Sequence, residues 1–155
     1  MSAALDEPSP QPSDYRLDRS VGHLLRRAHQ RHVALFQIQA AETGLTPPQL
    51  AALAGLHLLG RTTQNALGRA VAMDSATIQG VVQRLLARGL VTAARDPMDR
   101  RTLVLALTEP GHAALAHGAA CAVRARDELL GCLSAEERET FLALLRKAAG
   151  VEATS

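Results

Sequence analysis

The order of helix and strand signals constrains the fold of this chain more than any other feature. Four helical segments come first, two strand-like runs follow at residues 90–94 and 102–107, and two helical segments close the chain. Three helices followed by a two-stranded hairpin are typical of a winged helix-turn-helix. We therefore predict a mainly α-helical fold with a small β-hairpin, flanked by a long helix on each side.

Local signals at the helix ends support this order. Thr46 followed by Pro47 begins a helix, because the hydroxyl caps it and proline suits its first turn. Gly89 closes another helix, and Ser134 with Glu137 forms a capping box for the last one. The predicted helices span about residues 17–41, 47–59, 62–71, 75–88, 108–130 and 134–149.

The length and composition fit one domain. The 155 residues are 47% hydrophobic, which suffices for one compact core or for a small core that closes on dimerisation. Residues 1–14 are rich in Pro and polar residues, so we expect a disordered tail before a single domain over 15–155. The longest nearly apolar stretch, 51–60, is too short to cross a bilayer, and the N-terminus lacks the pattern of a secretory signal. We expect a cytoplasmic protein without membrane contact.

Motifs of enzyme and cofactor sites are absent from the sequence, which contains no GxGxxG, GxxxxGK[ST], HExxH or GxSxG pattern. Cys121 and Cys132 form no CxxC pair, and His29 and His32 lack a matching cysteine or acidic pair. The three aromatic residues argue against an RNA module that stacks bases. We therefore expect no enzymatic activity, no cofactor and no metal site.

Arginine is concentrated in the middle of the chain. Residues 61–101 contain seven Arg and three Asp, a net charge of +4, whereas the other residues carry 10 basic and 12 acidic side chains. Such a local positive field favours a polyanion at one surface. The charge alone also fits an ordinary solvated face. The arrangement of the neighbouring side chains therefore has to decide between a polyanion-binding surface and a solvated one.

The helix predicted at 75–88 has two different faces. Ile78, Val82 and Leu85 form an inward stripe. Another face is small and uncharged, with Arg84 and Arg88 toward its end; it consists of Ser75, Ala76, Gln79, Gly80 and Gln83. Glutamine can bond base edges and small residues permit close approach, so this face suits a DNA major groove with the two arginines near phosphates. The alternative is an exposed amphipathic helix whose polar residues have no role in binding.

The loop between the two strand-like runs carries three arginines, Arg95, Arg100 and Arg101, together with Asp96 and Asp99. The arginines repel one another unless the aspartates or an external anion screens them. A guanidinium at such a tip fits the narrow minor groove of DNA, where the negative potential is strongest. We predict that Asp99 organises this wing by holding an arginine extended. The alternative is a solvated turn closed by its own weak ion pairs.

Three stretches of the sequence resemble the MarR family of bacterial transcriptional regulators. They are LTPPQL at 45–50, ATIQGVVQRLLARGLV at 76–91, and DPMDRR at 96–101 continuing into LVLALTEPG at 103–111. The resemblance implies a homodimer whose N- and C-terminal helices, about 17–41 and 110–149, interlock beside a winged helix-turn-helix at about 45–108. It also implies a palindromic double-stranded DNA operator and a repressor that a small ligand releases.

The same resemblance places the DNA contacts on the third helix, the recognition helix and the wing. Together with the charge of the loop, which adds Arg95, the predicted contact residues are Thr63, Gln64, Ser75, Ala76, Thr77, Gln79, Gln83, Arg84, Arg95, Arg100 and Arg101. Thr63 and Gln64, near the third helix, are implied to bind phosphates. On the helix at 75–88 the uncharged residues are predicted to read bases, and Arg84 lies near phosphates.

Residues 15–32 resemble the opening of MarR members that control the degradation of aromatic acids, including nicotinate-type pathways. Effectors of the family lodge between the dimer helices and the winged domain, and an imidazole or guanidinium facing an apolar pocket suits an aromatic carboxylate. We therefore predict an effector of this class, contacted by His29 or His32 with an arginine such as Arg31. The alternative is that His32 is a hydrogen-bonded core residue.

Two other functions are compatible with the sequence. The first is a thiol-based redox regulator, although peroxide-sensing members carry a cysteine near the start of the first helix, where this chain has Tyr15. Cys121 and Cys132 lie about 16 Å apart along a presumed helix, so they cannot pair within it, and we predict buried, inert thiols. The second is a winged-helix module that contacts proteins without binding DNA.

Overall fold

The computed structural model describes residues 15–151, and the tail predicted over residues 1–14 lies outside the described residues. The elements are a turn of 3-10 helix (Leu17–Arg19), α1 (Val21–Gln39), α2 (Pro47–Leu59), α3 (Gln64–Ala70), α4 (Ser75–Ala87), β1 (Val91–Arg95), β2 (Leu103–Leu107), α5 (Glu109–Leu129) and α6 (Ala135–Ala148). This order confirms the predicted fold class, a mainly α-helical winged helix-turn-helix with long helices on both sides.

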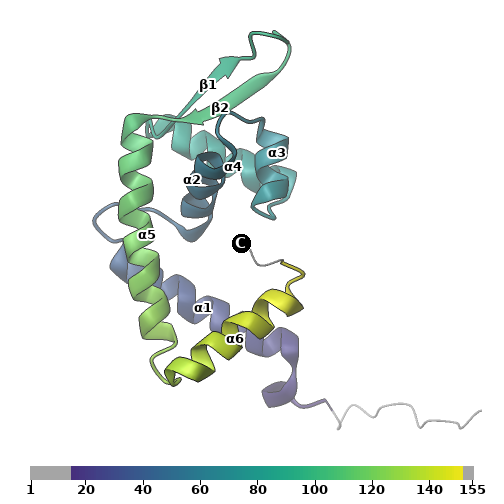
Figure 1. Cartoon of the computed structure of the whole chain (residues 1–155), viewed down its shortest axis with the longest axis vertical. Helices are drawn as coiled ribbons and strands as arrows, with labels where there is room; N and C mark the ends of the chain where they lie inside the picture. Colours follow the sequence, from purple (N-terminus) through teal and green to yellow (C-terminus); the bar gives the residue numbers. More distant parts are fainter. Residues whose placement is uncertain (1–14, 152–155) are drawn as a thin grey trace, which may run out of the picture.

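The described part of the chain is elongated, with the β1–β2 hairpin at one end and α1 and α6 at the other (Figure 1). The long helix α5 runs along one side of the molecule and connects the two ends. It packs against β2, α2 and α1. The position of the winged part relative to α1 therefore depends on this helix.

The core of the winged part is built around α2. A capping box between Thr46 and Gln49 begins this helix, as the sequence predicts from Thr46. Leu53 and Leu56 are fully buried, because α2 packs against α3, α4, α5 and β2. Leu58 at the end of the helix points to solvent and is 79% exposed. The prediction that α2 forms the buried centre is confirmed.

Helix α4 lies against α2 and α3 through the predicted stripe. Ile78, Val82 and Leu85 are all buried, so the assignment of its inward face is confirmed. Gly89 follows the helix with a φ of 67°, a left-handed conformation that glycine adopts without strain. The amide of Leu90 then bonds the carbonyl of Leu85, which completes the C-terminal cap.

The hairpin is tied to the helices at its base. β1 and β2 pair antiparallel, with Val91 opposite Leu107. Thr62, just before α3, exchanges two backbone hydrogen bonds with Leu105, at 3.1 and 2.7 Å. These bonds hold the base of the wing beside the start of α3, while its tip extends away from the helices (Figure 1).

Two predictions need correction. The helix predicted over 17–41 is interrupted at Ser20, whose backbone is extended. The Ser20 hydroxyl caps α1 by accepting from the amide of His23. The second concerns the thiols, since Cys121 is buried but Cys132 is exposed. Because α5 ends at Leu129, Cys132 lies in the turn after it and not on the same helix.

Apolar side chains remain exposed where α1 and α6 lie. Val21 of α1 is 71% exposed, Leu25 of the same helix is 50% exposed, and α6 buries no residue in the single chain. Phe141 and Leu144 of α6 belong to the same exposed set. Within residues 15–151, the structure contains no helix with the length and apolar character needed to cross a membrane.

The start of α5 approaches the end of α4 closely. Thr108 caps α5 and donates its hydroxyl to the carbonyl of Gly89 at 2.7 Å. A Cβ on Gly111 would overlap the carbonyl oxygen of Leu90. Glycine is therefore required at this contact between backbones.

Replacing Gly111 by Ala is expected to lower the free energy of unfolding by about 1–3 kcal/mol, because the added methyl meets backbone. Gly80→Ala is the matched control inside a helix, since its Cβ would meet only the Arg84 side chain at 3.6 Å. This control should raise stability by about 0.5–1 kcal/mol. Urea unfolding at one protein concentration measures both changes, and equal stability of the two variants would contradict the close approach.

Candidate functional site

The outward face of α4 is small and uncharged over most of its length. Its exposed residues are Ser75, Ala76, Thr77, Gln79 and Gln83, followed by Arg84. Asp74 fixes the start of the helix by accepting from the backbone amide of Thr77 at 2.8 Å and from its hydroxyl at 3.0 Å. These hydrogen bonds hold the pKa of Asp74 below its ordinary value. The face thus offers hydroxyl and amide groups at its centre and positive charge at its end.

A groove of about 430 Å³ lies between the start of α2 and the outward face of α4. Its lining consists of Thr46, Pro48, Ala76, Thr77, Gly80, Val81 and Arg84. Ala76 and Gly80 keep the groove open because they carry almost no side chain. Close approach of another molecule to α4 is therefore sterically possible, as a helix in a major groove requires.

Thr63 and Gln64 stand at the start of α3, and both are half-buried. Thr63 is the N-cap, with its hydroxyl accepting from the amide of Ala66 at 3.3 Å. The hydroxyl proton is not used by this cap and can still be donated to an acceptor. The geometry is thus compatible with the phosphate contact that the family resemblance implies.

The aspartates of the wing loop bind its own backbone. Asp99 accepts from the amide of Arg101 at 3.0 Å and from the hydroxyl of Thr102 at 2.7 Å, and Asp96 accepts from the amide of Met98 at 2.8 Å. The Thr102 hydroxyl, followed by the Arg101 amide, lowers the pKa of Asp99. Asp99 therefore organises the loop through adjacent polar groups and not, as predicted, by holding an arginine side chain.

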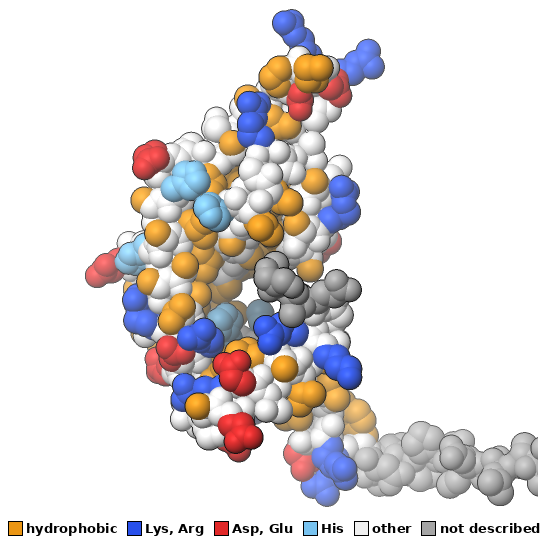
Figure 2. Space-filling model, viewed as in Figure 1, with side chains coloured by type: hydrophobic (Ala, Val, Ile, Leu, Met, Phe, Trp, Pro, Cys, Tyr) orange, Lys and Arg blue, Asp and Glu red, His pale blue; other side chains and the backbone are white. Residues whose placement is uncertain are grey.

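The charges of the wing arginines are not paired with acidic groups of the described residues. The ion pairs found within 15–151 join Arg16 to Asp18 and Arg126 to Asp127. Arg95 donates to the carbonyl of Arg100 at 2.7 Å and braces the loop. Figure 2 shows basic side chains projecting from the hairpin end of the molecule. The alternative of a turn closed by its own ion pairs is not what this loop forms.

The two arginines predicted to lie near phosphates on α4 differ in their contacts. Arg84 is exposed on the outward face and lines the groove beside α2. Arg88, the C-cap of α4, instead donates to the backbone carbonyl of Thr43 at 2.7 Å. Arg88 is therefore engaged within the protein.

An apolar pocket of about 350 Å³ lies among α1, the end of α5 and α6. It is lined by Leu25, Ala28, His29, His32, Arg126, Leu129, Leu130, Phe141, Leu142 and Leu145. The structure brings His29 and His32 together there, because residues three apart share a helix face. Arg31 does not line the pocket, and Arg126 of α5 supplies the guanidinium instead. Sequence reasoning missed Arg126, whose only local signal is that it precedes two leucines of the same helix face.

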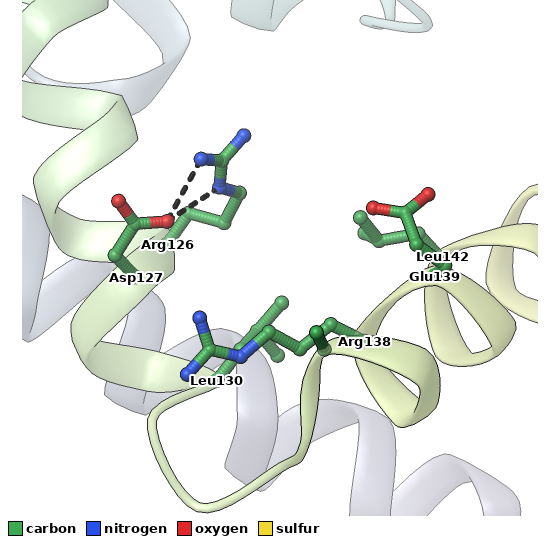
Figure 3. Close-up of a pocket in the computed structure, with 7 residues that line it drawn as sticks. Arg126, Asp127, Leu130, Arg138, Glu139 and Leu142 are labelled. Carbon is green, nitrogen blue, oxygen red and sulfur yellow. Dashed lines mark hydrogen bonds and ion pairs between the residues drawn. The ribbon is translucent and has the colours of Figure 1, made fainter.

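Arg126 is held by its neighbour on α5. Its Nε and Nη2 atoms donate to Asp127 at 3.0 and 2.8 Å, as Figure 3 shows. A second cavity of about 280 Å³ adjoins the apolar pocket and shares Arg126, Leu130 and Leu142 with it. Arg138 and Glu139 of α6 line this second cavity. A carboxylate entering the apolar pocket would therefore compete with Asp127 for Arg126.

Comparisons with known proteins identify the family. Residues 43–102 match the model of the MarR family. The transcriptional repressor NicR of Pseudomonas putida is 46% identical over 143 residues, which cover 90% of each chain. The chain belongs to the MarR family. It is thus a DNA-binding transcriptional regulator, which confirms this prediction over the alternative of a module that binds only proteins.

Two solved structures of regulators are also similar to this MarR-family chain. BpsR of Bordetella bronchiseptica, whose DNA binding is regulated by 6-hydroxynicotinic acid, is 38% identical with a TM-score of 0.81, covering 89% of this chain and 99% of that chain. PcaV of Streptomyces coelicolor, solved with its natural ligand, is 34% identical with a TM-score of 0.80, covering 88% and 96%. The fold is therefore shared over nearly the whole length of both relatives.

Replacing Thr102 by Val is expected to raise the pKa of Asp99 toward its ordinary value of 3.8, because the Thr102 hydroxyl contributes most of the lowering. The folded-state pKa is the lower one, so the carboxylate stabilises the loop above pH 3.8 and this contribution disappears as pH falls through the folded-state pKa. An NMR titration of the Asp99 carboxyl carbon measures the change. Thr92→Val, on the exposed part of β1, is the control and should leave that titration unchanged. If the pKa of Asp99 were the same in T102V as in the wild type, the hydrogen bond from Thr102 would be contradicted.

Proposed function

We propose that this chain acts as a homodimeric repressor that binds a palindromic operator and releases it when an aromatic carboxylate binds. The wing tip carries the DNA part of this proposal. Arg100 and Arg101 are exposed there, and the nearby aspartates are occupied by the backbone of the loop. Binding in a DNA groove requires positive charge at the margin of the contact surface and hydrogen-bonding groups at its centre. The unpaired guanidinium groups of the wing and the uncharged face of α4 provide these two features.

In this proposal α4 enters the major groove, and the hairpin reaches the adjacent minor groove. The residues of α4 that face the bases are Ser75, Ala76, Thr77, Gln79 and Gln83. Thr63, Gln64 and Arg84 bind phosphates. The wing residues that act at the minor groove are Arg95, Arg100 and Arg101. Arg95 contributes indirectly, since its guanidinium already holds the carbonyl of Arg100.

A second copy of the chain is the partner proposed for the α1–α6 end. Exposed apolar residues such as Val21 and Phe141 support this, because pairing two copies would remove them from water. The dimer would place its two recognition helices about 34 Å apart, one turn of duplex DNA. The unit is one domain over 15–155, with the winged part at about 45–108 between dimerisation helices at about 17–41 and 110–149. As a DNA-binding regulator, it would work in the cytoplasm.

The apolar pocket among α1, α5 and α6 is the proposed effector site. Its volume of about 350 Å³ falls within the range of small-molecule sites, and its lining is apolar except for two histidines and one arginine. An aromatic ring fits between the leucines and Phe141, while Arg126, with His29 or His32, binds the carboxylate. The regulation of BpsR by 6-hydroxynicotinic acid supports an effector of this class.

Release of DNA follows from the position of the pocket. A ligand there contacts α1 and α5, and α5 also packs against the winged part. A ligand that favours a different separation of the two recognition helices needs only about 1–3 kcal/mol of coupling to weaken DNA binding 5–150-fold.

Replacing Arg101 by Ala is expected to weaken binding to a duplex that the wild-type protein selects from a random library. The log–log dependence of affinity on salt should become shallower by about 0.9 for each phosphate that the variant no longer neutralises. Lys147→Ala, in the last turn of α6 and outside the winged part, is the matched control and should change neither quantity. Unchanged affinity and an unchanged salt slope in R101A would refute the wing assignment.

Replacing His32 by Ala is expected to abolish the response to the aromatic acid, measured with nicotinate and 6-hydroxynicotinate as probes. In the wild type, a bound acid should raise the melting temperature and release the selected duplex. H32A should lack both effects and still bind the duplex without acid, and the exposed His117→Ala serves as control. A normal response in H32A would exclude His32 as a contact. If neither acid raised the melting temperature or released the duplex in the wild type, the effector class would be refuted but not the DNA interface.

A further inference from the structure

The C-terminal end of the recognition helix α4 is fastened to both flanking parts of the molecule. Arg88 donates its Nη2 to the carbonyl of Thr43, which lies 45 residues earlier, between α1 and α2. On the other side, Thr108 at the start of α5 donates its hydroxyl to the carbonyl of Gly89. Both bonds measure 2.7 Å, and they join three separate segments of the chain at one point.

The segment that receives Arg88 is a compact turn and not a loose loop. The amides of Thr43 and Gly44 both bond the carbonyl of Ala40, at 3.1 and 2.9 Å. The Thr43 hydroxyl also donates to that carbonyl and accepts from the amide of Leu45. Because these bonds tie Thr43 to the end of α1, a displacement of α1 moves the carbonyl that Arg88 holds.

The end of α1 is in turn held by α5. Arg124 donates its Nε to the side-chain oxygen of Gln39 at 2.8 Å, and the thiol of Cys121 donates to the Gln39 carbonyl at 3.2 Å. Arg124 also contacts the sulfur of Cys121 at 3.2 Å. Hydrogen bonds, together with the peptide link from Gln39 to Ala40, thus connect α5 through the end of α1 and the Thr43 turn to α4.

We propose that Arg88 is a positioning residue that couples the placement of α4 to the turn between α1 and α2, and that it is not a phosphate contact. This inference rests on the proposed DNA-binding function and names a link by which a change in α1 and α5 would reach the recognition helix. The guanidinium bonded to a backbone carbonyl fixes the end of α4, and the angle of its outward face follows from that anchor. Both side chains are exposed, but Arg84, one turn earlier, lines the groove beside α2 and is the residue of this helix proposed to bind phosphate.

The test compares Arg88→Met with Arg84→Met and Arg88→Lys, all as full-length protein with a duplex selected by the wild type. Removing a phosphate-binding side chain weakens selected and random duplexes alike and reduces the salt slope, so R84M should show this pattern. R88M should keep the wild-type salt slope and show about tenfold less preference for the selected duplex, because α4 is no longer held at one angle. R88K retains a donor for Thr43 and should restore most of that preference.

Hydrogen exchange at the amides of Thr43, Gly44 and Leu45 provides a readout that phosphate binding alone would not change. In the wild type, the selected duplex should slow exchange at this turn, and R88M should abolish that effect while R84M retains it. In the free protein, R88M should already exchange faster at these amides than R84M. Thermal unfolding of each variant checks that it is folded.

A reduced salt slope in R88M equal to that of R84M, with equal weakening on random and selected DNA, would overturn the proposal and make Arg88 a phosphate contact. Turn amides that do not respond to the duplex in the wild type would overturn the coupling. If the wild type selected no duplex, the proposed function would fail separately. Hydrogen exchange of R88M and R84M without DNA would then still decide whether Arg88 holds the turn. Turn amides that exchange equally fast in the two variants would reject this role of Arg88.

Discussion

Burial of α2 is the interaction on which the rest of the structure depends. Leu53 and Leu56 of this helix are fully enclosed by α3, α4, α5 and β2. Several of these partners carry a candidate functional group on the side that does not touch α2: the outward face of α4, the start of α3 and the hairpin. Because a close-packed core leaves few alternative arrangements, the candidate DNA-binding groups keep constant positions relative to one another.

Short-range hydrogen bonds decide the electrostatics of the side that carries these candidate groups. Asp74, Asp96 and Asp99 each bind donors two or three residues later in the chain. Such donors are already in place when the turn forms, whereas an exposed ion pair with a flexible arginine contributes little free energy. The carboxylates are therefore used to shape the helix start and the wing loop. The positive charge of Arg100 and Arg101 is left for an external anion.

The other end of the molecule is incomplete as a single chain. Helix α6 buries none of its residues, and α1 exposes apolar side chains over much of its length. Such surfaces are costly in water, which supports the proposed association with a second copy. The apolar pocket lies at this same end, against α1 and α5. Helix α5 and the turn at Thr43 extend from there to α4, so the proposed effector would act on α4 by this route.

The sequence by itself determined the element order, the caps at Thr46 and Ser134 and the two faces of α4, because these depend on residues within a few positions of one another. The resemblance of the wing motif to a known family added the DNA-binding role. Tertiary structure alone decided that Arg126, and not Arg31, lines the pocket with His32, and that Arg88 holds Thr43. These pairings join residues tens of positions apart. They form only because α1, α4 and α5 pack around one core, and no local pattern records which side chains that packing brings together.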